Sequence, residues 1–227
     1  MRWRTLLLPA VASIALLAGC TASPEPTPTP TPTTNGLENL AAEEIEARMH
    51  EALREAGSFR LAGTAEVEGQ TTEVDLAVVG EAMEGSFVVM GIEVELLVAE
   101  DGTTYLRGGQ ALFGPLLGTE LGDIGGKWIK LPATDDLGLI PDTEDFLAAD
   151  SHYTKGEVTE YQGQPAITLV DSDGAKLYVS LVGEPYPLAI ETAEGTLEFT
   201  DIGADITIEA PPADEVIELS SLGSPMS

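Results

Sequence analysis

Apolar and polar side chains alternate with a period of two over most of the chain after residue 57. In residues 92–98, for example, four aliphatic side chains alternate with Glu93 and Glu95. Successive side chains of a β-strand point to opposite faces, so this pattern predicts antiparallel strands with one apolar and one acidic face. It predicts such strands at 59–67, 73–78, 92–98, 155–162, 165–171, 175–182, 187–193 and 195–202, and a short one at 205–209.

Turn-forming residues separate these segments. Asp101-Gly102 is a strong hairpin signal, because both residues tolerate the positive φ angles of tight turns. Asp171-Ser172-Asp173-Gly174 resembles the opening of a calcium loop, but the remaining ligands are missing and a hairpin turn is the better interpretation. Further turns are predicted at Glu68-Gly69-Gln70, Glu84-Gly85-Ser86, Gln162-Gly163, Gly183-Glu184-Pro185 and Glu194-Gly195.

Residues 37–56 show a helical period instead. Leu37, Ile45, Met49 and Leu53 recur at helical spacing and Gly57 supplies a stop, which predicts one amphipathic helix. Residues 110–150 are rich in Gly and Leu, and we predict two short helices there around a strand-like segment at Trp128. The segment 211–222 is expected to close the domain.

An extended sheet must cover its apolar face, and the predicted helices are the available cover. The predicted fold class is therefore α+β, a curved antiparallel sheet covered on its concave side by helices.

The first twenty residues have the features of an export signal. Arg2 and Arg4 precede an apolar run that is too short for a spanning helix. The tetrapeptide that ends at Cys20, Leu-Ala-Gly-Cys, resembles the lipobox of bacterial lipoproteins, in which the cysteine becomes the acylated N-terminus. The resemblance implies a signal peptide at 1–19 and a diacylglycerol and palmitate anchor on Cys20. The alternative is a buried thiol in an apolar helix.

Residues 20–36 would form a tether. Proline alternates with threonine here, which favours extended polyproline II at ~3.1 Å per residue and a reach of about 50 Å. The expected organisation is thus signal peptide, tether, one domain at 37–222 and a tail at 223–227. The expected location is the extracytoplasmic face of the cell membrane, and the Thr-Pro composition would accept O-linked sugars.

The charge and cysteine content exclude several partners. Without Arg2 and Arg4, the chain has 8 basic and 39 acidic residues, a net charge of −31. Such a surface repels nucleic acid and anionic lipid headgroups. Solubility is its simplest explanation, and a docking face or loose cation binding are alternatives. Cys20 is the single cysteine, so the domain cannot depend on disulfides. We expect a monomer.

The sequence contains no recognisable catalytic or metal-binding arrangement. It has no nucleophile motif, and His50 and His152 stand alone, each best explained as a solvated surface residue. Carboxylates are numerous but scattered, so no pair of them is informative. We therefore expect neither an enzyme, nor a cofactor, nor a metal.

The combined pattern resembles a known family of lipoproteins. A lipobox, a spacer, one amphipathic helix, hairpins with an acidic face and a central insertion together resemble the LppX/LprA/LprF/LprG group of actinobacterial lipoproteins, within the LolA-like superfamily. Short segments support the resemblance: Gly126-Lys127-Trp128, Leu177-Tyr178-Val179 and Glu184-Pro185-Tyr186-Pro187-Leu188. Members of this group fold as a half-barrel, and a cavity beneath their helices binds acyl chains of lipids or lipoglycans.

By this resemblance the chain would bind or carry lipid against the apolar strand face. The alternatives are a dry core that packs on the helices, in a surface-interaction or regulatory ectodomain, and a solute-binding protein for a transporter, for which two βα lobes are missing. The expected lipid-lining residues are Phe59, Leu61, Val67, Val74, Leu76, Val78, Ile92, Val94, Leu96, Val98, Leu177, Val179, Leu188 and Ile190, with Phe113, Leu116 and Leu117 from the helical cover.

Overall fold

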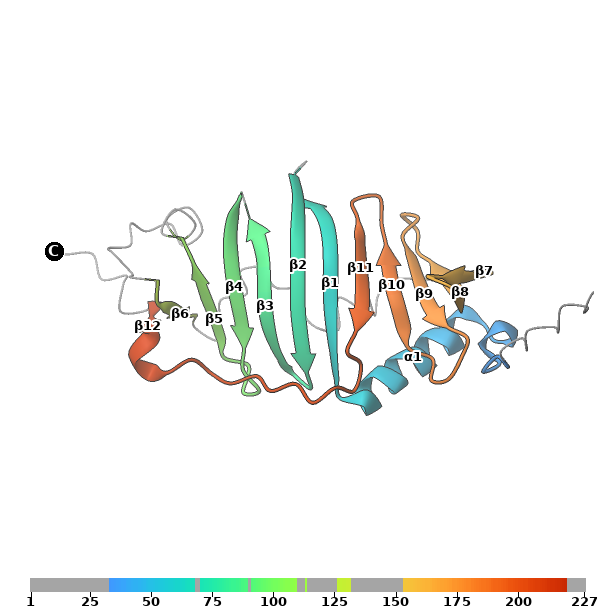
Figure 1. The fold of residues 1–227 in the computed structure, drawn as a ribbon, viewed down its shortest axis with the longest axis horizontal. Coiled ribbons are helices and arrows are strands. Elements are labelled where there is room, and N and C mark those ends of the chain that lie inside the picture. Colours follow the sequence, from blue (N-terminus) through green and yellow to red (C-terminus); the bar gives the residue numbers. More distant parts are fainter. Residues whose placement is uncertain are drawn as a thin grey trace, which may run out of the picture. The chain divides into compact units, whose positions relative to one another are not determined.

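Twelve strands form one sheet in the computed structural model of the chain (Figure 1). The structure describes residues 33–67, 70–89, 91–109, 113, 126–131 and 153–219. Residues 33–227 constitute one compact unit. The expected signal peptide, Cys20, most of the tether, His152 and the tail lie outside the described residues.

The sheet consists of two meanders that meet in its centre. The first meander runs from β1 outward to β6, and the second runs from the opposite edge at β7 inward to β11, which pairs with β1. β12 then adds to β6 in parallel. The strands are β1 (Ser58–Val67), β2 (Gln70–Val79), β3 (Ala82–Val89), β4 (Ile92–Val98), β5 (Thr104–Gly108), β6 (Trp128–Lys130), β7 (Thr154–Tyr161), β8 (Gln164–Val170), β9 (Lys176–Ser180), β10 (Pro187–Glu191), β11 (Thr196–Thr200) and β12 (Val216–Glu218).

The alternation of the sequence sets the two faces of this sheet. Leu96 is 1% exposed on the face that we call the inner face, whereas its neighbour Glu95 lies on the outer face. One row of directly paired residues crosses the inner face through eight strands: Phe199, Leu61, Leu76, Gly85, Leu96, Leu106, Ile129 and Ile217.

One α-helix, α1 (Ala42–Ala56), packs on this sheet. Its start is fixed by the Glu44 carboxylate, which accepts a hydrogen bond from the backbone N–H of Ala41 at 3.2 Å, and Gly57 ends it at φ 76°. The expected helix therefore exists, but residues 37–39 form a separate 3₁₀ turn, η1 (Leu37–Asn39), before it. A second 3₁₀ turn, η3 (Ala213–Glu215), precedes β12.

The helix lies along the half of the sheet that runs from β9 to β1 (Figure 1). The segment before it bonds to the end of β9 through Asn35, whose backbone N–H donates to the Leu181 carbonyl at 2.8 Å, and the helix ends where β1 begins (Figure 1). Ile45, Met49 and Leu53 are buried in the same apolar cluster as the inner strand residues. No other α-helix with defined ends lies in the part of the chain that the structure describes.

The predicted fold class is therefore wrong in one respect. The sheet is antiparallel apart from β12, open and curved, but helices do not cover it as a whole, because the one described α-helix lies along the half from β9 to β1 (Figure 1). The prediction of further helices relied on Gly and Leu content in residues 110–150, and composition without a 3.6-residue period is weak evidence for a helix. The strand expected at Trp128 is confirmed as β6, and most of the remaining segment lies outside the described residues.

Two local predictions are also wrong. Glu84-Gly85-Ser86 is not a turn, because β3 continues through it and the turn lies at Gly80–Glu81. A Cβ at Gly85 would lie 2.1 Å from the Asp75 carbonyl oxygen, so this glycine permits a close approach of two strands. Residues 205–209 form no strand, and the last strand is β12 at 216–218.

Candidate functional site

The inner face of the sheet is the site that the sequence predicted, and the expected residues divide into three groups. Phe59, Leu61, Leu76, Val78, Val94, Leu96, Phe113, Leu177 and Val179 are buried. Val74, Ile92, Val98, Leu188 and Ile190 keep partial exposure. Leu116, Leu117 and the side chain of Val67 lie outside what the structure describes.

The buried group at the α1 end packs against protein. Leu177 and Val179 are 1% and 0% exposed and share one core cluster with Ile45 and Met49 of the helix. An acyl chain could reach this end of the face only by displacing these protein contacts.

A row of partly exposed residues crosses the middle of the inner face. Ile190 on β10 pairs with Leu197 on β11, and Leu197 pairs with Gly63 on β1. The same row continues through Val74 on β2 and Phe87 on β3. All four apolar side chains touch the buried cluster yet retain exposed surface, and Gly63 adds no side chain between them. We call these five residues the open row.

Leu188 occupies an irregular position. The register between β9 and β10 shifts between Pro187 and Ala189, so Pro187 and not Leu188 stands opposite Val179. A β-bulge changes the face of the sheet toward which the following side chains point. The alternation of apolar and polar residues in the sequence does not reveal it. The prediction also omitted Met83, Phe87, Leu106, Ile129, Leu169, Leu197 and Phe199, which belong to the same apolar assembly and follow the same alternation.

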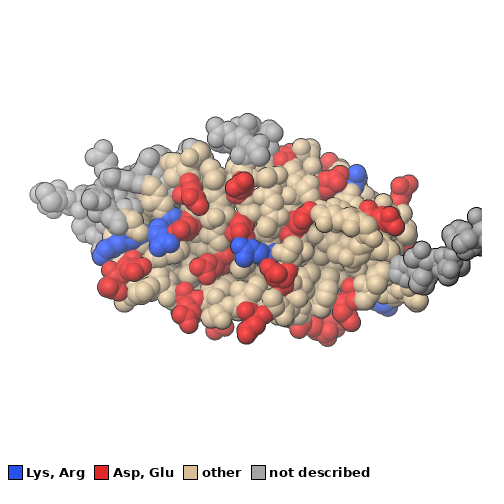
Figure 2. Space-filling view, viewed as in Figure 1, with Lys and Arg blue, Asp and Glu red and all other residues tan. Residues whose placement is uncertain are grey.

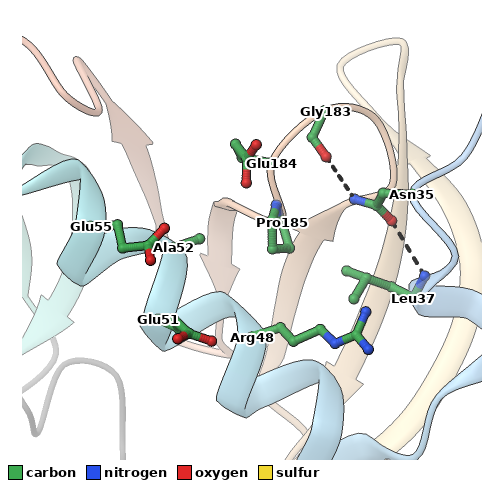
Figure 3. A pocket seen from close by; sticks show the side chains of 9 residues that line it. All are labelled: Asn35, Leu37, Arg48, Glu51, Ala52, Glu55, Gly183, Glu184 and Pro185. Carbon is green, nitrogen blue, oxygen red and sulfur yellow. Dashed lines mark hydrogen bonds between the residues drawn. The ribbon is translucent and has the colours of Figure 1, made fainter.

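A polar groove lies between α1 and the turn that joins β9 to β10 (Figure 3). It has a volume of about 440 Å³ and contains Arg48, Glu51 and Glu55 of the helix and Glu184 of the turn. Asn35 forms its rim, where the side-chain amide donates to the carbonyls of Ser180 and Gly183 at 3.0 and 3.2 Å. The groove is open and its charged side chains lie on the surface, so we interpret it as a solvated cleft and not as a ligand-binding site.

The outer face carries most of the charge. Figure 2 shows Asp and Glu scattered over the visible face with few Lys and Arg among them. Arg60 donates to both carboxylate oxygens of Asp75 at 2.7 and 2.6 Å, and this contact raises the pKa of Arg60. Arg107 pairs with Glu95 and lies 4.5 Å from the centre of the Trp128 ring. These pairs join neighbouring strands.

Two tyrosines join the strands at the other end of the outer face. The Tyr161 and Tyr178 rings lie 4.8 Å apart, and the Tyr161 hydroxyl donates to Glu198 Oε1 at 2.7 Å. Burial first, and the hydrogen bond to Glu198 second, raise the pKa of Tyr161 to about 12. The hydroxyl therefore stays neutral and acts as a fixed donor.

The described residues contain no group of three or more metal-ligating side chains. His50 is partly exposed and contacts Glu46 one helical turn away at 3.7 Å. At the calcium-like turn, the Asp171 carboxylate accepts from the backbone N–H groups of Asp173 and Ala175 at 2.8 and 2.9 Å, so the hairpin interpretation is confirmed. Among the described helices, none has the length and apolar character needed to cross a membrane.

Comparison with known proteins gives little further information. No family model and no curated protein sequence matches the chain. Among solved structures the fold is similar to PNGF-II, with 8% identity, a TM-score of 0.31 and coverage of 71% of this chain and 30% of that one. It is also similar to a DUF1329 family protein from Desulfovibrio piger, with 8% identity, a TM-score of 0.31 and coverage of 73% and 92%. The chain thus spans less than a third of PNGF-II, and similarity at this level says nothing about function.

Proposed function

We propose that this chain is a lipoprotein, held at the extracytoplasmic face of the cell membrane by an acylated Cys20, whose domain binds or carries lipid acyl chains on the inner face of its sheet. It does so without catalysing a reaction. The observation on which the proposal depends is the inner face itself, which is apolar across eight strands while the one described α-helix lies along the half of the sheet from β9 to β1.

The chemistry of the inner face suits hydrocarbon. Apart from Gln70 at the start of β2, the register places apolar side chains, glycine and threonine at the inner positions of β1 to β5, and the acidic residues of these strands take outer positions. Each square ångström of apolar surface removed from water contributes about 25 cal/mol, so a bound acyl chain gains free energy without any specific polar contact. Selectivity among lipids would then depend on the shape and length of their acyl chains.

The open row is the part of this face that offers a bound acyl chain apolar surface not yet covered by protein. Val74, Phe87, Leu197 and Ile190 keep exposed apolar surface, and a ligand there need not displace the packing at the α1 end. Strands lie about 4.8 Å apart, so the five strands of the open row span about 19 Å, a length suited to one long acyl chain.

Anchoring at Cys20 would keep this face near its lipid source. Two or more acyl chains hold a protein stably at a bilayer, because each buried methylene contributes about 0.8 kcal/mol. The Pro-Thr tether leads to residues 33–36, where Asn35 fixes the chain to the end of β9.

A second function is favoured by the tight packing at the α1 end. Leu61, Leu177 and Val179 are at most 1% exposed, as expected of a dry core. A domain with a dry core throughout would act as a surface-interaction or regulatory module, and its acidic outer face would meet the partner.

A matched pair of variants distinguishes these functions. Phe87 and Val88 are adjacent, both half-buried, and lie on opposite faces of β3. We expect Phe87→Asp to abolish binding of the fluorescent fatty acid cis-parinaric acid and Val88→Asp to leave it unchanged. Circular dichroism of both variants serves as the control that each of them is folded. Equal binding by the two variants, or no binding by the unmodified domain, would exclude the lipid function.

A further inference from the structure

The segment that joins β11 to β12 differs from the rest of the described sheet. Residues 203–215, which we call the strap, run past the ends of β1 to β5 without joining any of them as a strand (Figure 1). Ile206, Ile208 and Pro211 are half-buried and alternate with exposed neighbours, so one side of the strap faces the protein.

Fixed contacts hold the strap at its two ends. At its start, the Ser58 hydroxyl donates to the Ala204 carbonyl at 2.6 Å, and the Gly203 N–H donates to the Ser58 carbonyl at 2.8 Å. At its far end, Lys127 Nζ donates to the Asp214 carbonyl at 3.0 Å. Between Ala204 and Pro212, the described hydrogen bonds of the strap backbone are local to the strap.

The far end is the weaker of the two. β12 has three residues, pairs in parallel with β6, and forms the edge of the sheet. Parallel pairing is slightly less stable per residue than antiparallel pairing, and short exposed edges open at low free-energy cost. The Lys130–Glu218 ion pair that bridges the two strands is 3.5 Å long and exposed, so it adds little.

Detachment of β12 would uncover the apolar inner face. Ile217 and Leu219 pack against the core cluster beside Ile129, which is 0% exposed, and Leu106, which is 1% exposed. These residues are at the β12 end of the row that crosses eight strands, so this edge leads directly to the inner face and lies far from the packing of α1.

We propose that the strap and β12 form a gate, and that release of β12 from β6 admits acyl chains to the inner face from this edge. The inference rests on the proposed lipid function. The hydrogen bonds of Gly203 and Ala204 to Ser58 form the fixed end of the strap. Pro211 and Pro212 stiffen the segment next to β12, so this segment and β12 move together.

A reversible disulfide tests the gate. Lys130 and Glu218 stand directly opposite each other, so Lys130→Cys with Glu218→Cys locks β12 to β6. Arg60→Cys with Ala77→Cys, opposite positions on the outer face of β1 and β2, is the matched control lock. The full mature chain is loaded with cis-parinaric acid on phosphatidylcholine vesicles, and transfer of the probe to albumin is followed.

We expect the oxidised gate lock to slow transfer by about tenfold or more, since access then requires a rarer opening. A reducing agent restores the rate, and the control lock leaves it unchanged. Equal rates for the oxidised and reduced gate lock overturn the gate while leaving lipid binding intact.

Hydrogen exchange gives a readout that needs no lipid. In the unlocked chain, the amides of β12 at residues 216–218 should exchange about a hundredfold faster than those at 58–79, and the gate lock should remove most of the difference. Equal exchange in the two regions refutes the gate even if no lipid binds. Absence of probe binding, with fast exchange in β12 that the lock suppresses, refutes the lipid function alone.

Discussion

Replacing Leu96 by alanine measures how much the inner face contributes to stability. Leu96 is 1% exposed and stands between Gly85 on β3 and Leu106 on β5 in the row that crosses the sheet. Because Gly85 has no side chain to move into the space, a cavity remains. We expect Leu96→Ala to lower the free energy of unfolding by about 3 kcal/mol, within the usual range for a buried leucine.

Urea denaturation of the unit Thr33–Ser227 provides the assay, with circular dichroism as the signal. Val158→Ala is the matched control, because Val158 is 59% exposed and its truncation should change stability by at most about 0.5 kcal/mol. A loss below about 1 kcal/mol for Leu96→Ala would refute the view that this row is closely packed. An unchanged denaturant slope would show that the variant alters stability and not the unfolded state.

Three further predictions concern contacts outside this row. The pKa of Tyr161 is raised to about 12 by burial, against about 10 in an unfolded chain, so stability should fall as the pH rises from about 10 to about 12. Unfolding measured across this range should show a shallower fall in Tyr161→Phe, and an identical slope would contradict the assignment. Asn35→Ala removes side-chain hydrogen bonds to Ser180, Gly183 and Leu37, and should cost about 1 to 2 kcal/mol in urea denaturation; an unchanged midpoint would show that this attachment is not stabilising. Gly63→Val would place a Cβ 2.1 Å from the Thr196 carbonyl oxygen, so it should cost more than about 2 kcal/mol, and a stable, native-like variant would disprove the close approach of β1 and β11.

The sequence predicted the helix and most of the strands because their signals are local, but it did not predict β3 and β5. Alternation marks which side chains share a face, and Gly57 and Asp101-Gly102 end their elements where the positive φ of glycine permits a turn. The same local rules misled at Gly85, which lies inside a strand and not in a turn.

Long-range pairing was not predictable from these patterns. Residues 205–209 alternate like a strand, but alternation does not show whether a hydrogen-bonding neighbour exists, and here the described chain runs past the strand ends. The parallel pairing of β12 with β6 joins segments 88 residues apart, for which no turn or spacing signal exists. The candidate site was predictable as an apolar face, whereas its division into a tightly packed end and the open row depends on the position of α1 in space.

Native mass spectrometry of Thr33–Ser227, exported with a cleavable signal and recovered from the envelope of its host without detergent, tests most directly whether the inner face holds a ligand. We predict a second population, heavier than the polypeptide by the mass of an acyl lipid, that disappears in Phe87→Asp and persists in Val88→Asp. A single population at the bare polypeptide mass, which also fails to take up added fatty acid, would contradict this prediction.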